Sequence, residues 1–143
     1  MLHDAIESPA EASPADFRTR YEAELASVVA ARGVDAVAAE TDLDRDTVES
    51  IADGDTPELT LSEAASVLGT DDDRPDAEAI TAETRDHLML GMTTGILDVD
   101  TVAADIGIDL TGKEVQQALE GRTPVTLGQL AEIQAYIESQ QRP

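Results

Sequence analysis

The sequence predicts an all-α protein built as a tandem duplication of one four-helix unit. Apolar residues recur at helical spacing in stretches separated by glycines, prolines and capping residues. Hydrophobic residues make up 41% of the 143 residues but aromatic ones only 2%, so the core must be aliphatic. Motifs of the first half return in the second. We therefore expect a disordered tail over 1–13, one unit over 14–69, an acidic linker over 70–76 and a second unit over 77–140.

Local signals mark each helix of the first unit. Ser13 and Pro14 suit the N-cap and the first position of a long helix, which Gly33 ends. Thr60 and Glu63 have the spacing of a capping box, in which each side chain bonds a free backbone N–H of the other residue. The helices of this unit are expected at 14–32, 34–41, 44–52 and 61–68.

The second unit repeats this order. Its long helix begins at Asp76 or Thr81 and runs to about Leu97. Segment 99–105 repeats the pattern of 34–40, and segment 115–121 repeats that of 48–54. The pair Thr126 and Gln129 repeats the spacing of Thr60 and Glu63. A unit of roughly 60 residues is marginally stable alone. The two units are therefore expected to share a core.

Each unit is predicted to have a long helix, two short helices joined by a tight turn, and a fourth helix. This order resembles that of lambda-repressor-like helix-turn-helix domains. The segment TGKEVQQALEG (111–121) resembles a recognition helix of that family, with Val115 and Ala118 facing inward. The resemblance implies that this helix enters the major groove, where Gln suits adenine and Lys suits guanine. The candidate DNA-contacting residues are Thr111, Lys113, Gln116 and Gln117, with Gly112 also expected to face outward.

Charge separates the two units. From 42 to 55 there are six acids and one base, and this surface would repel DNA phosphates. From 109 to 122 there are three acids and two bases, which is nearly neutral. Any DNA recognition is therefore expected in the second unit, and the first is expected to be structural.

The whole chain carries a net charge of −22, from 31 acids and nine bases. Self-repulsion of this size is screened in molar salt, where the Debye length is about 3 Å. We therefore expect a protein from a salt-accumulating halophile, although an acidic surface for a basic partner is an alternative. The stretches HLMLGMTTGILDVDTVA (87–103) and KEVQQ (113–117) resemble a small uncharacterised family of haloarchaeal proteins, which implies no mechanism.

One face of the second long helix carries His87, Gly91 and Gly95. Two glycines stand where a metal or catalytic site would need ligands, so close approach of another helix is the better interpretation. That helix would belong to the same chain or to a partner, as in a homodimer. Met89 and Met92 are expected to fill the core.

Several classes of protein are disfavoured. The chain has no Cys and only two His, which argues against thiol chemistry and a His-based zinc site. It has no phosphate loop, nucleophile elbow or paired-acid motif, so no enzyme activity, cofactor, metal or small-molecule substrate is expected. Its most apolar stretch, 88–97, is shorter than the ~20 residues of a membrane span.

The sequence thus predicts a cytoplasmic, non-enzymatic protein that binds DNA and regulates transcription. Two alternatives stay open. One is a protein-interaction module that uses the helix-turn-helix scaffold without DNA, and the other is a non-binding duplication with a structural role.

Overall fold

The computed structural model describes residues 11–141, and over this range the chain is helical with no β-strand. This confirms the predicted all-α class. The expected tail lies for the most part in residues 1–10, outside the described residues. The helices are α1 (Pro14–Arg32), α2 (Val34–Glu40), α3 (Arg45–Ala52), α4 (Leu61–Leu68), α5 (Ala77–Thr94), α6 (Val99–Asp105), α7 (Gly112–Leu119) and α8 (Leu127–Ser139).

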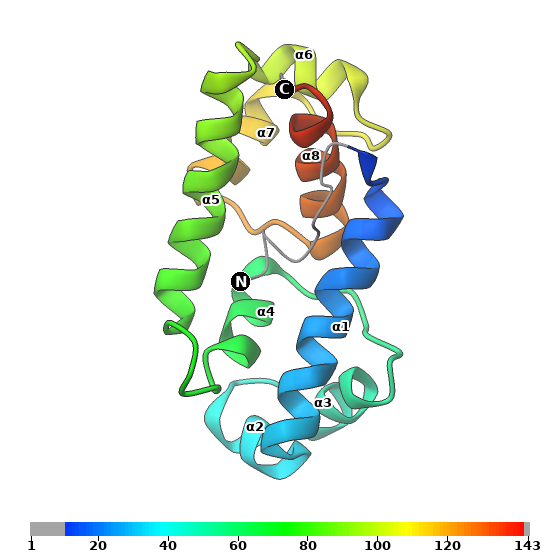
Figure 1. The fold of residues 1–143 in the computed structure, drawn as a ribbon, viewed down its shortest axis with the longest axis vertical. Coiled ribbons are helices and arrows are strands. Elements are labelled where there is room, and N and C mark those ends of the chain that lie inside the picture. Colours follow the sequence, from blue (N-terminus) through cyan, green and yellow to red (C-terminus); the bar gives the residue numbers. More distant parts are fainter. Residues whose placement is uncertain (1–10, 142–143) are drawn as a thin grey trace.

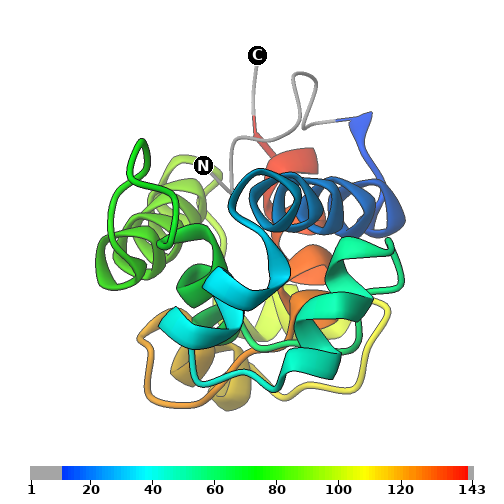
Figure 2. The ribbon, with the colours of Figure 1, turned by 90° about the horizontal axis from the view of Figure 1, so that it is seen from below.

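The two long helices, α1 and α5, flank the molecule in Figure 1, with α4 and α8 between them. The short helices α2 and α3 lie at one end, and α6 and α7 lie at the other. In the view from below, α1 and α5 occupy one side, and α3 and α7 lie toward the opposite side (Figure 2). Helix α1 packs against α8, and α5 packs against α4, so each long helix crosses between the halves of the chain.

The helix starts follow the sequence closely. Four helices begin with a complete capping box, formed by Ser13 and Asp16, Thr60 and Glu63, Thr111 and Glu114, and Thr126 and Gln129. In each box the N-cap hydroxyl accepts a hydrogen bond from the backbone N–H three residues later. These four helix starts therefore coincide with capping signals that can be read from the local sequence.

Helix α5 ends earlier than the apolar pattern suggested. It begins after Asp76, whose side chain accepts the N–H of Ala79, and it stops at Thr94 instead of Leu97. Ile96 adopts a left-handed conformation with φ 53°, and the N–H of Leu97 bonds the carbonyl of Met92 at 2.8 Å. This is the hydrogen-bond pattern of a Schellman cap, in which the left-handed position is normally glycine.

The starts of α4 and α8 meet at the centre of the molecule. Thr60 and Thr126 form an isolated antiparallel bridge. The N–H of Leu61 donates to the carbonyl of Val125, and the N–H of Leu127 donates to that of Leu59, both at 2.8 Å. This reciprocal pair joins the two halves of the chain through the backbone.

A single hydrophobic cluster spans both halves. Its members are mainly aliphatic, as the composition requires. The largest fully buried side chains are Tyr21, Phe17, Leu25, Ile51, Leu68, Ile80, Leu127, Leu130, Ile133, Ile137 and Gln134. Because these residues come from α1, α3, α4, α5 and α8, the two halves bury their apolar faces against each other.

The acidic segment 70–76 packs against helices α4 and α1 and does not extend freely. Thr70 is buried, and its hydroxyl donates to the carbonyl of Val67 at 2.7 Å. Arg74 forms ion pairs with Glu24 of α1 at 2.7 Å and with Asp71 at 3.2 Å. The segment thus connects α4 to α5 and also contacts α1.

Candidate functional site

Helix α7 presents a polar side that has few internal contacts. Lys113 and Gln116 are exposed and Gln117 is half-buried, whereas Val115 and Leu119 are buried in the core. Positions three and four apart on a helix are neighbours, so Lys113 lies beside both glutamines. Lys113 forms no ion pair with any described residue. The structure therefore brings three of the four predicted DNA-contacting residues together.

The fourth, Thr111, is exposed but has a local role. Its hydroxyl accepts the N–H of Glu114 at 3.1 Å as the N-cap of α7. Gly112, expected to face outward, is buried instead, because Asp100 of α6 lies against it. A Cβ on this glycine would lie 2.0 Å from Oδ1 of Asp100. Ala118 is half-buried, and Leu119 takes the fully inward position that the sequence assigned to Ala118.

Helix α3, which lies at the other end of the molecule, has no such free base. Arg45 pairs with Asp35 of α2 at 3.1 Å and with Glu49 of α3 at 3.3 Å. Its exposed surface otherwise carries Asp46 and Glu49. A phosphate approaching this helix would meet carboxylates and an arginine whose charge is already compensated.

The predicted interaction face at His87, Gly91 and Gly95 is turned toward α8 of the same chain. A Cβ on Gly91 would lie 2.5 Å from Cγ2 of Ile137, and Nε2 of His87 lies 3.2 Å from Oε1 of Glu138. The glycine at 91 thus allows a close approach of helices within the chain. A partner on this part of α5 would have to use another side of the helix.

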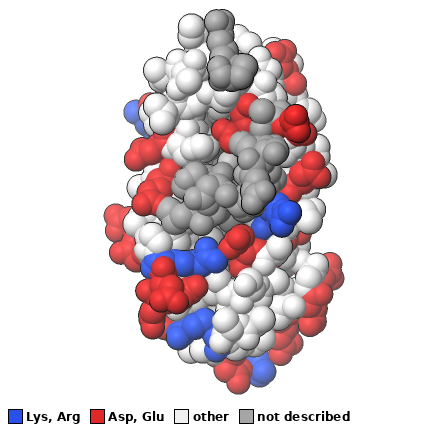
Figure 3. Space-filling view, viewed as in Figure 1, with Lys and Arg blue, Asp and Glu red and all other residues white. Residues whose placement is uncertain are grey.

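That other side is apolar. Met89, Leu90 and Ile96 are the exposed large hydrophobic residues of the described chain, with exposed fractions of 46, 66 and 83%. The expectation that Met89 fills the core is wrong, because α5 turns it away from α8, whereas Met92 does pack against the core. The part of the visible surface over the C-terminal half of α5 is correspondingly uncharged, while acidic side chains spread over the rest (Figure 3). Met89, Leu90 and Ile96 are called the α5 patch below.

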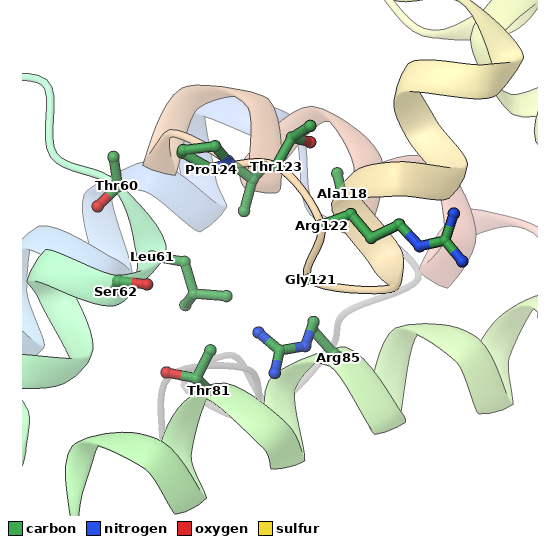
Figure 4. Close-up of a pocket in the computed structure, with 11 residues that line it drawn as sticks. Thr60, Leu61, Ser62, Thr81, Arg85, Ala118, Gly121, Arg122, Thr123 and Pro124 are labelled. Carbon is green, nitrogen blue, oxygen red and sulfur yellow. The ribbon is translucent and has the colours of Figure 1, made fainter.

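A further feature was not anticipated from the sequence. A cavity of about 280 Å³ opens between α4, α5 and the loop that joins α7 to α8 (Figure 4). Its lining comes from three separate segments, 60–62, 81–85 and 118–125, and includes Arg85 and Arg122. No sequence motif signals such a site, because only the packing of α5 against α4 assembles it.

Within residues 11–141, no group of three or more His, Cys, Asp or Glu side chains is placed to hold a metal ion. Over the same part of the chain, no helix is both long and apolar enough to cross a membrane.

The fold and these surfaces define an all-α protein in which both halves of the described chain share one aliphatic core. The chain belongs to a family of unknown function, DUF5791, which matches residues 17–140. Comparisons with curated proteins and with solved structures found no match.

Proposed function

We propose that this protein is a non-enzymatic DNA-binding regulator in which α7 is the recognition helix. The observation that carries the proposal is the exposed row of Lys113, Gln116 and Gln117, whose lysine has no acidic partner among the described residues. Side chains of these types make bidentate or donor contacts with base edges in the major groove. The corresponding helix α3 offers only the ion-paired Arg45.

The arrangement of the helices supports a duplicated helix-turn-helix scaffold for this function. The reciprocal bonds around Thr60 and Thr126 join equivalent points of the two halves. The pairs α2–α3 and α6–α7 lie at opposite ends of the molecule, each beside a long helix (Figure 1). We propose that the first unit, with its acidic α3, supports the fold, and that the second unit binds DNA.

The net charge of −22 constrains how such a protein would bind. Lys and Arg contacts to phosphates supply most non-specific affinity, and high salt removes that contribution. A protein adapted to concentrated salt would therefore depend on direct contacts with bases. The nearly neutral surface of α7 suits this mode better than an extended basic face.

The test is selection of genomic DNA fragments in multi-molar KCl. The wild type is compared with a Lys113→Ala/Gln117→Ala variant and with a matched Asp46→Ala/Ser50→Ala variant on α3. Loss of one good base contact costs about 1–3 kcal/mol, so the α7 variant should lose enrichment roughly tenfold or more. The α3 variant should keep it. Absence of enrichment in the wild type, or equal loss in both variants, would refute the proposal.

A second candidate function is self-association through the α5 patch. The exposed large hydrophobics of the described chain all lie there, and residues 88–97 contain no charged side chain. Two copies of a strongly acidic chain can approach with least repulsion through an uncharged surface. Sedimentation of the wild type should then show a concentration-dependent dimer that Leu90→Gln weakens. A monomer at all concentrations would exclude this function.

A further inference from the structure

The cavity beside α4 and α5 has an unusual charge for this protein. Its lining includes no Asp or Glu, although the chain contains 31 acids. Two arginines and four hydroxyl side chains are present instead. The lining residues are Thr60, Leu61, Ser62, Thr81, Arg85, Ala118, Gly121, Arg122, Thr123, Pro124 and Val125.

Arg85 is the central cation of this cavity. Its guanidinium extends from α5 into the opening in Figure 4, and it makes no hydrogen bond or ion pair with any described residue. By contrast, Arg18, Arg32, Arg45, Arg74 and Arg122 each pair with a carboxylate. An arginine that pairs with no carboxylate in the described part of so acidic a chain is available to an external anion.

The backbone at Gly121 lies close to this guanidinium. A Cβ at Gly121 would lie 2.9 Å from Cζ of Arg85, so only glycine allows the two to lie this close. Gly121 also has φ 76°, a backbone conformation that residues with a side chain rarely adopt. The guanidinium of Arg85 thus packs directly against the turn that ends α7.

Further donors lie around the opening. In the first turn of α4, the N–H groups of Leu61 and Glu63 are bonded to Val125 and Thr60, whereas the N–H and hydroxyl of Ser62 bond no described residue. Thr123 contributes another hydroxyl from the α7–α8 loop. Arg122 lies on the same loop, but its guanidinium points away from the cavity in Figure 4 and pairs with Glu120 at 3.4 Å.

We propose that this cavity binds a phosphate group of a small phosphorylated molecule. A guanidinium binds two phosphate oxygens at once, and hydroxyl and backbone N–H groups can bind the remaining ones. Arg85 would hold the anion, and Ser62 and Thr123 would complete its shell from the other two segments. The phosphate of a nucleic-acid strand offers the same chemistry. That source would depend on the proposed DNA binding, whereas a small molecule would not.

The first arm of the test is calorimetric titration with pyrophosphate, in the lowest KCl concentration at which circular dichroism shows the chain folded. Wild type should bind saturably. Arg85→Gln should weaken binding roughly tenfold or more, the effect of losing charged hydrogen bonds. Arg20→Gln is the matched control, because it removes an exposed arginine of α1 that also lacks a partner among the described residues. Its affinity should equal that of the wild type.

The second arm measures duplex DNA binding by the same three proteins. Pyrophosphate binding that depends on Arg85 supports the small-molecule source, whether or not DNA binds. DNA binding that depends on Arg85, without pyrophosphate binding, supports a phosphate site filled by the nucleic-acid backbone. If neither ligand binds, or if Arg20→Gln has the same effect as Arg85→Gln, the phosphate site is excluded. The α7 variant tests DNA recognition separately, since Lys113 and Gln117 do not line the cavity.

Discussion

Helices α1 and α5 bury residues at the same spacing but with different side chains. The buried positions of α1 are Phe17, Tyr21, Leu25, Val28 and Val29, and those of α5 are Ile80, Thr84, Leu88 and Gly91. Both series begin with steps of four, four and three residues. At three of these four shared positions α5 carries the smaller residue. Five residues after the fourth position stand Gly33 and Ile96, both with positive φ.

The two helices thus bury residues at the same spacing but fill the core to different extents. Helix α1 fills the core with two aromatic rings and ends in a glycine that adopts its conformation without strain. Helix α5 buries less volume, lets α8 approach closely at Gly91, and places a strained Ile96 in solvent. Strain and exposed apolar surface in the same place are typical of a functional region. Helix α5 also carries Arg85 into the cavity, so it contributes to two of the candidate surfaces.

The largest expected effect on stability is at the first buried position of the two helices, Phe17 in α1 and Ile80 in α5. Phe17→Ala should lower the free energy of unfolding by about 3–5 kcal/mol, and Ile80→Ala by about 2–5 kcal/mol, because the lost transfer energy and the cavity scale with the side chain removed. Urea denaturation of both variants measures the difference. If Ile80→Ala is the more costly change, α5 and not α1 supplies the more important half of the core.

The next effect tests the close approach at Gly91. Gly91→Ala should lower the free energy of unfolding by about 1–3 kcal/mol, since overpacking displaces buried neighbours. The new Cβ would lie 2.5 Å from Cγ2 of Ile137. Adding Ile137→Leu removes that branch and should restore part of the loss. A Gly91→Ala variant as stable as the wild type would show that α5 and α8 can separate at no cost.

A smaller effect belongs to Tyr21, which has Thr84 as its counterpart. Its hydroxyl donates a hydrogen bond to Gln134, and burial, followed by the charge of Glu138, raises its pKa above the ordinary 10.0. In the unfolded chain Tyr21 ionises near pH 10, while the folded protein keeps it neutral. Its contribution is therefore complete below that pH and is lost as the pH rises above it.

Tyr21→Phe should cost about 0.5–1.5 kcal/mol at neutral pH for the lost hydrogen bond. Above pH 10 the stability of the wild type should fall more steeply than that of the variant. Tyr136, whose pKa is also raised, chiefly by its hydrogen bond to Asp105, is present in both proteins and cancels in the difference. Parallel stability–pH curves from thermal melts would contradict this account of Tyr21.

The smallest effect is a gain. Ile96→Gly should raise the free energy of unfolding by roughly 0.5–1 kcal/mol, because relief of left-handed strain exceeds the entropy that glycine adds to the unfolded chain. The same change removes the most exposed residue of the α5 patch. If the patch mediates self-association, the variant should be more stable as a monomer and weaker as a dimer. Thermal melts and sedimentation measure the two quantities separately, and a loss of stability would contradict the assigned strain.

Much of the fold could be predicted from the sequence because its signals are local. The capping boxes at Thr60 and Thr126, the start at Ser13 and the buried stripe of α1 all depend on residues within a few positions of each other. The end of α5 could not be predicted in the same way. Its apolar pattern continues to Leu97, but the backbone turns at Ile96, a residue type that seldom adopts that conformation.

The candidate site was predictable only in part. Spacing placed Lys113, Gln116 and Gln117 on one side of α7, which the structure shows. The sequence pattern wrongly placed Gly112 at the surface. Asp100 of α6 covers this glycine, and that contact depends on how α6 packs against α7. The pattern also gave no sign of the cavity at Arg85, whose lining comes from three segments.

The sequence by itself determined the helical class, most helix boundaries, the aliphatic core and the contrast in charge between α3 and α7. Each of these follows from composition or from interactions within one or two helical turns. Tertiary structure alone decided that Gly91 meets Ile137, that Met89 faces solvent and that Arg85 lies beside Gly121 with no partner among residues 11–141. Those outcomes depend on contacts between residues 30 or more positions apart, whose free energy is set by the packing of whole helices.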